Sequence, residues 1–202
     1  MSSEYNISDL IQFHNAIDDF NYNLTVDWAI DLIRNGLETD NVFMLASFTK
    51  PVDKAEVKPY LSAVLKDLSL EEKEGKEATF EFTHYHMHKI LGDDAIRRNL
   101  DVLYELFLEN DSFNDDDKFG LTPFYFLHYA WSELEDIGCN FYFEGATLDN
   151  IEEVIKEQAS IWIDKYIHGI KIDTDKVYHS NYMLSKSEKK ETLFSKIKIW
   201  FS

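Results

Sequence analysis

The sequence predicts a mainly α-helical protein, built as an irregular multi-helix bundle or an α–α superhelix. Only 7 Gly and 3 Pro interrupt its 202 residues, which argues against a turn-rich β-sandwich. Hydrophobic residues make up 45% of the chain, enough for a core despite a net charge of −18. Apolar residues at helical spacing recur along most of the chain, in segments bounded by capping residues, Gly or Pro.

Three short helices are expected first. One runs over residues 8–20, with Ser8 as its N-cap and apolar side chains at helical spacing. The second begins at Thr25 and ends at Gly36, since glycine adopts the positive φ common after a helix. Thr39 is expected to cap the third, which Pro51 closes.

A fourth helix is expected from about Val57, with Pro59 in its first turn, where the missing N–H costs nothing. After it, Ser69 and Glu72 have the spacing of a capping box and predict a further helix start. Residues 78–91 fit either a strand or a helix, because their apolar residues match both periods. The helix is preferred.

The second half of residues 94–109 is apolar on most sides, which predicts a central, buried helix. An exposed acidic loop is expected over residues 111–120. Thr122 and Pro123 then start a helix that ends at Gly138.

A brief β element is expected near 141–143, and Thr147 is expected to cap the longest helix. Helical periodicity is lost after Gly169, and a second β element or a docking segment is expected in the C-terminal tail, around 197–200.

Charge divides the chain into two parts. Residues 1–168 hold 13 Lys and Arg against 34 Asp and Glu, whereas residues 169–202 hold 7 against 4. We therefore expect an acidic helical domain over 1–168 and a basic, less regular segment over 169–202 that packs on this domain or on a partner.

Several classes of function lack their signatures. Cys139 is the only cysteine, so neither an internal disulfide nor a cysteine zinc cluster can form, and we expect it to be buried or half-buried. The sequence has no secretory leader, no apolar run long enough to span a bilayer and no nucleotide-binding or nucleophile motif. These features predict a cytoplasmic protein that is not an enzyme and needs no cofactor.

Three histidines are the candidate metal ligands: His84, His86 and His88. On a helix, His84 and His88 share a face, with Glu81 as a third ligand, and on a strand all three histidines share one. The alternative, which we prefer, is that they are surface or half-buried side chains of an aromatic-rich helix.

Acidic residues are the candidate contacts for a basic protein partner. Phosphates and anionic lipids would be repelled by this charge, so neither nucleic acid nor membrane is expected to bind. The candidates lie in the loop and near the end of the helix that follows it: Asp111, Asp115, Asp116, Asp117, Glu133, Glu135 and Asp136.

Aromatic residues also suggest an interaction surface. Trp28, Trp131 and Trp162 fall on helix stripes and are expected in the core. In contrast, aromatic residues cover every side of the helix at 122–137, so part of the series must face another element or a partner. Trp200 and Phe201 are expected to be exposed.

Four segments resemble a group of small, acidic, all-helical bacterial proteins. Some members of this group have gene neighbourhoods that suggest a role in toxin immunity. The resemblance spans about residues 26–136 and implies a helix over 78–91 but no catalytic residue. Its segments are Trp28–Gly36, Ile90–Asp93, Ala95–Leu106 and the run from Leu121 to Asp136.

Together these observations favour a non-catalytic binding protein, of which an immunity-type inhibitor of a basic toxin or nuclease is one form. The alternatives are a structural or adaptor protein and, less favoured, a histidine-based metal enzyme. A monomer or a homodimer is expected, the latter through residues 170–202.

Overall fold

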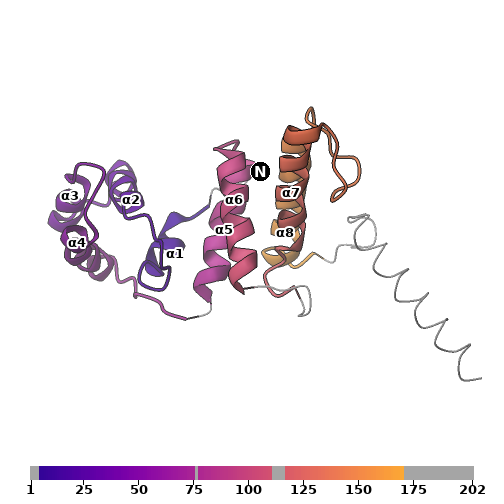
Figure 1. Cartoon of the computed structure of the whole chain (residues 1–202). Coiled ribbons are helices and arrows are strands. Elements are labelled where there is room, and N and C mark those ends of the chain that lie inside the picture. Colours follow the sequence, from indigo (N-terminus) through magenta and orange to yellow (C-terminus); the bar gives the residue numbers. More distant parts are fainter. Residues whose placement is uncertain (1–4, 76, 111–116, 171–202) are drawn as a thin grey trace, which may run out of the picture. The chain divides into compact units, whose positions relative to one another are not determined.

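The computed structural model describes residues 5–75, 77–110 and 117–170, and in these residues the chain is helical and contains no β-strand. None of the helices in these ranges has the length and apolar character needed to cross a lipid bilayer. The mainly α prediction is therefore confirmed for the described residues. The helices are α1 Ile7–Gln12, α2 Asn23–Arg34, α3 Asp40–Ala46, α4 Lys54–Asp67, α5 Glu77–Leu91, α6 Ile96–Asn110, α7 Thr122–Ile137 and α8 Ile151–Tyr166 (Figure 1).

The chain forms two compact units, Met1–Tyr85 and His86–Ser202. In the first unit α2 packs on α3 and α3 on α4. Its core is apolar and includes Leu10, Trp28, Val42, Leu61 and Leu65. The expected division at residue 168 stays a prediction, because residues 171–202 lie outside the described ranges.

The second unit is built around α7, which packs against α6 and α8. The buried faces of these helices are mainly apolar, and burial of such surface contributes about 25 cal/mol per Å² to folding. Its fully buried side chains include Leu100, Leu103, Phe124, Leu127 and Ile155.

Several local predictions are confirmed. Thr39 caps α3 by accepting a hydrogen bond from the Val42 N–H at 3.2 Å. Gly36 and Gly138 follow α2 and α7 with φ of 80° and 75°, values that residues with a Cβ rarely adopt. Residues 78–91 are helical, within α5.

Other helix boundaries differ from the expected ones. The first helix ends at Gln12 and is capped by Asn6, because the Ser8 hydroxyl instead accepts a hydrogen bond from the Trp28 indole. Asp53 caps α4 with two hydrogen bonds, so Pro59 lies inside the helix and not in its first turn. Thr25 lies inside α2, where its hydroxyl donates to the Tyr22 carbonyl.

Two further predictions are wrong for reasons of hydrogen bonding. No helix begins at Ser69, because the Glu72 carboxylate accepts hydrogen bonds from Ser62 and Asn15 at 2.5 and 2.6 Å instead of closing a capping box. Residues 141–143 form bends and not a β element, because the Asn140 side chain accepts two of their backbone N–H groups.

Candidate functional site: an aromatic and acidic seam

The three candidate histidines lie on α5, where His88 is half-buried and His84 and His86 have different partners. His84 Nδ1 lies 3.4 Å from Glu81 Oε1, and the ring meets the edge of Tyr5. His86 is buried and its Nδ1 lies 2.7 Å from Asn99 Oδ1. Within the described ranges, no group of three or more His, Cys, Asp or Glu residues is placed to hold a metal ion.

The partner of His86 fixes which of its ring nitrogens carries the proton. The Asn99 amide donates to the carbonyls of Asp94 and Ala95, so its oxygen faces the imidazole and His86 Nδ1 donates to it. Burial lowers the pKa of His86 to about 4. The ring is therefore neutral at pH 7 and joins α5 to the start of α6.

Of the candidate residues in the acidic loop, Asp111, Asp115 and Asp116 lie outside the described residues. Asp117 is described and its Oδ1 accepts a hydrogen bond from the Leu121 N–H at 2.8 Å. This bond satisfies a backbone donor at the start of α7, which has no other side-chain cap.

The acidic candidates on α7 are held in part by the protein itself. Glu133 accepts a hydrogen bond from the Phe141 N–H at 3.0 Å, and Glu135 accepts one from the Trp131 indole at 2.9 Å. Asp136 is exposed. The three carboxylates therefore lie at one end of α7, where two of them also fix neighbouring groups.

A group of polar and aromatic side chains lies where α6 and α7 run side by side. The sequence does not predict it as a site, although the aromatic series on α7 indicates that part of this helix faces another element or a partner. We call it the α6–α7 seam, and it comprises Arg97, Asp101, Tyr104, Tyr125, His128, Tyr129 and Ser132.

Stacked rings form one end of the seam. The Tyr104 ring stacks on His128 at a centroid distance of 4.0 Å and on Tyr125 at 5.6 Å. The hydroxyls of Tyr104 and Tyr129 lie 3.2 Å apart. This hydrogen bond raises the pKa of Tyr104 to about 12, and burial raises that of Tyr125 to about 12, so both phenols are protonated at pH 7.

A charged network forms the other end. Asp101 lies 3.4 Å from both Arg97 Nε and His128 Nε2. The Arg97 guanidinium also donates to the Ser132 hydroxyl at 3.1 Å and lies over the Trp131 ring. Burial lowers the pKa of His128, although the nearby Asp101 carboxylate acts to raise it. The imidazole is therefore largely neutral at pH 7.

The network contains Ser132, His128 and Asp101, yet its geometry does not match a nucleophilic triad. The Ser132 hydroxyl donates to the His128 backbone carbonyl and accepts from Arg97. A triad needs this hydroxyl to donate to the imidazole. These two hydrogen bonds instead hold the Ser132 hydroxyl between α7 and Arg97 of α6.

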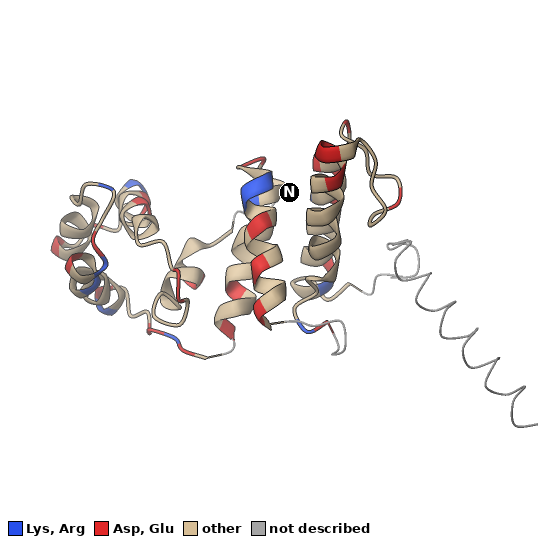
Figure 2. Cartoon of the chain, in the orientation of Figure 1, with Lys and Arg blue, Asp and Glu red and all other residues tan. Residues whose placement is uncertain are grey.

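Acidic residues flank the seam on both helices. The helices α6 and α7 carry six Asp or Glu and two Arg, and Figure 2 shows red residues along α6 and at one end of α7. Tyr104, Tyr125 and Tyr129 are half-buried, while Glu105 beside them is exposed. The seam thus offers ordered aromatic rings next to acidic residues of α6.

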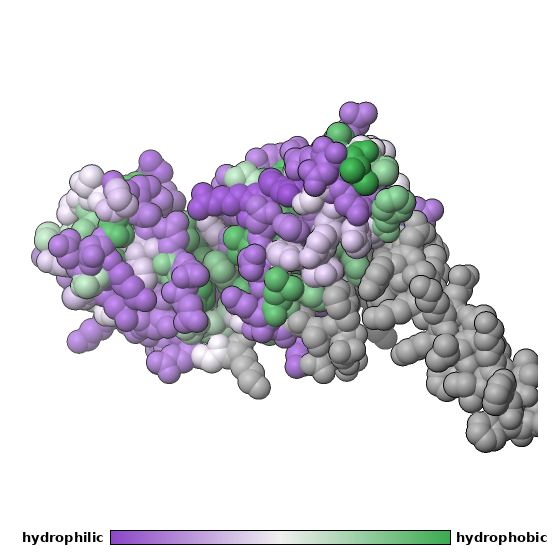
Figure 3. Space-filling view, viewed as in Figure 1, coloured by the Kyte–Doolittle hydropathy of each residue, from purple (hydrophilic) through white to green (hydrophobic). Residues whose placement is uncertain are grey.

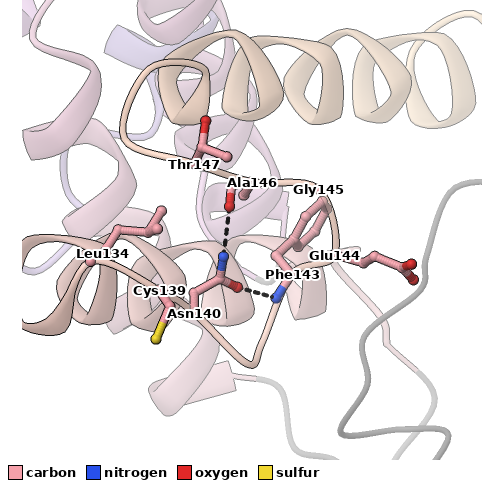
Figure 4. Close-up of a pocket in the computed structure, with 9 residues that line it drawn as sticks. Leu134, Cys139, Asn140, Phe143, Glu144, Gly145, Ala146 and Thr147 are labelled. Atoms are coloured by element: carbon pink, nitrogen blue, oxygen red, sulfur yellow. Dashed lines mark hydrogen bonds between the residues drawn. The ribbon is translucent and has the colours of Figure 1, made fainter.

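A hollow of about 390 Å³ lies in the loop between α7 and α8 (Figure 4). Asn140 shapes this loop, donating to the Ala146 carbonyl at 2.8 Å and accepting from the Phe143 N–H at 2.8 Å. Cys139 is exposed, contrary to the expected burial. The lining residues are Leu134, Gly138, Cys139, Asn140, Phe143, Glu144, Gly145, Ala146 and Thr147.

Comparisons of the chain with protein-family models, with curated proteins and with solved structures return no match.

Proposed function

We propose that this chain is a non-catalytic binding protein that recognises a basic protein surface through the α6–α7 seam. The observation that carries the proposal is the set of tyrosines Tyr104, Tyr125 and Tyr129. They are half-buried, their rings contact one another, and a hydrogen bond joins Tyr104 to Tyr129, on helices that carry six Asp or Glu against two Arg. Tyrosine is enriched in protein interfaces because it supplies a large contact area at a low entropic cost.

Order within the seam supports this role. Side chains that are already fixed lose less conformational freedom on binding, so more of the contact energy appears as affinity. The faces of the tyrosine rings attract Lys and Arg side chains, and the surrounding carboxylates accelerate the approach of a cationic surface. The same acidic field disfavours nucleic acid.

A more specific form of the proposal is an immunity-type inhibitor that acts in the cytoplasm, as a monomer or homodimer, on a basic toxin or nuclease. A nuclease cleft is cationic because it binds phosphates, so an acidic surface can occupy it in their place. The resemblance of residues 26–136 to acidic bacterial proteins also favours this form.

The test is selection of peptides from a random display library with the full chain as bait. We expect the selected peptides to be rich in Lys and Arg, and the affinity of a synthetic copy to fall when salt rises from 50 to 300 mM, in line with a Debye length of about 10 Å at 0.1 M. Tyr129→Ala should weaken binding about tenfold, as expected for an interface hot spot.

A matched control is Tyr60→Ala, since Tyr60 is also half-buried but packs on Phe48 in the other unit. It should leave the affinity unchanged. Selected peptides without excess positive charge, or an affinity insensitive to salt and to Tyr129→Ala, would contradict the proposal.

A further inference from the structure

The most exposed large hydrophobic side chains of the described residues cluster around the loop that follows α7. Ile137 and Phe141 are each 63% exposed and Leu148 is 53% exposed. Figure 3 shows green atoms over this loop, among purple neighbours. We call these three residues the 137–148 patch. Apolar surface of this kind marks a place where another group binds.

The hollow of the same loop lies beside the patch. Leu134, Phe143 and Ala146 give it apolar walls, and Glu144 points away from them (Figure 4). Its volume of about 390 Å³ is at the lower end of the range of small-ligand sites, and is large enough for one aromatic side chain.

Charge along the stretch of chain that carries the patch has one sign. Between Lys118 and Lys156 the sequence has no Lys or Arg but has seven Asp or Glu. Asp136, Glu144 and Asp149 are exposed. An occupant that suits this surface therefore carries apolar or aromatic side chains next to lysines.

Residues 171–202 of the same chain have this composition. They contain seven Lys against four acids, and residues 196–201 read Lys-Ile-Lys-Ile-Trp-Phe. The helix α8 has 16 residues and so separates its end from the loop by about 24 Å. The 26 residues between Ile170 and Ile197 span roughly 85 Å when extended, which is ample.

We propose that residues 197–201 bind the 137–148 patch in the same molecule, with Trp200 in the hollow and lysines next to the carboxylates. A tethered segment has an effective concentration in the millimolar range, so a weak contact is enough to hold it. This proposal does not depend on the binding of a basic partner by the seam.

Cys139 reports on this contact, because it is exposed, lines the hollow and is the only cysteine in the chain. The experiment measures the rate at which a disulfide reagent, Ellman's reagent, modifies Cys139 in the full chain. Trp200→Ala/Phe201→Ala should raise the rate about tenfold, which corresponds to about 1.4 kcal/mol of binding free energy. High salt should raise the wild-type rate as well.

The matched control is Tyr178→Ala/Tyr182→Ala, which removes two aromatic side chains from the same segment outside residues 197–201. It should leave the rate unchanged. An unchanged rate in Trp200→Ala/Phe201→Ala, or an equal rise in the control, would overturn the proposal. So would protection that disappears on dilution, because the occupant would then be a second copy of the chain.

Discussion

The ring of Tyr166 occupies the space where a side chain on Gly120 would begin. A Cβ built on Gly120 lies 2.5 Å from Tyr166 Cε2, and Gly120 has a φ of 68°. The neighbouring Trp162 indole donates to the Phe119 carbonyl at 2.6 Å and stacks on Tyr166. The end of α8 therefore fixes the backbone that leads into α7.

Gly120→Ala should lower the stability of the second unit by about 2–4 kcal/mol, through the clash and the strained backbone together. Urea unfolding followed by tryptophan fluorescence measures this loss. Gly145→Ala is the matched control, because Gly145 also has a positive φ but no atom within 4 Å of the added Cβ. It should cost only about 1 kcal/mol. Equal losses in the two variants would disprove the steric role of Tyr166.

Asp117 should act on stability through its hydrogen bond and not through its charge. Asp117→Ala removes the acceptor for the Leu121 N–H and should cost about 1 kcal/mol. Asp117→Asn keeps an oxygen in this place and should cost much less. Thermal unfolding of the two variants measures the difference. If Asp117→Asn lost as much stability as Asp117→Ala, the charge would be the stabilising feature.

His86 should make the second unit sensitive to acid. Its pKa is about 4 when folded and about 6.5 when unfolded, so below pH 6.5 the unfolded state takes up more protons. Stability is therefore complete above pH 6.5 and falls as the pH drops towards 4, by on the order of 3 kcal/mol from this group.

Replacing His86 with Asn keeps a donor for Asn99 but removes the titration. His86→Asn should therefore reduce the slope of unfolding free energy against pH between 4 and 6.5, measured by urea unfolding. His168→Asn, at an exposed position, is the control and should leave the slope as in the wild type. A His86→Asn slope equal to that of the wild type would show that His86 is not responsible.

The Asn140 side chain should control the order of the α7–α8 loop. Asn140→Ala removes acceptors for the Tyr142 and Phe143 N–H groups and the donor to the Ala146 carbonyl. Loss of these bonds should speed hydrogen exchange at Tyr142 and Phe143 about tenfold or more, since a single hydrogen bond contributes about 1 kcal/mol. Amide exchange followed by NMR measures this. Unchanged exchange there would mean that packing alone holds the loop.

Sequence reasoning succeeded where the signal was local. Thr39 and Gly138 lie at helix ends because capping and positive φ depend on adjacent residues only. It failed at Glu72, which has the spacing of a capping box with Ser69 but does not form one. Its carboxylate instead accepts hydrogen bonds from Ser62 and from Asn15, which is far away in sequence.

The seam shows the same limit. Tyr104 and Tyr129 come from separate helices, and their contact depends on the antiparallel register of α6 and α7. A sequence reveals which residues share a face of one helix, but not which face of a second helix lies opposite. The predicted acidic residues of α7 were near the seam, while the tyrosines that order it required the tertiary structure.

Because the amide of Asn140 sets the course of the α7–α8 loop, the loop's outward side chains are not needed to maintain its path. Substitutions at Phe141, Glu144 and Leu148, which are exposed, should thus change the surface of the loop without loss of the scaffold. A few surface substitutions can then alter the binding properties of the loop on an unchanged backbone, as in the variable loops of an antibody framework.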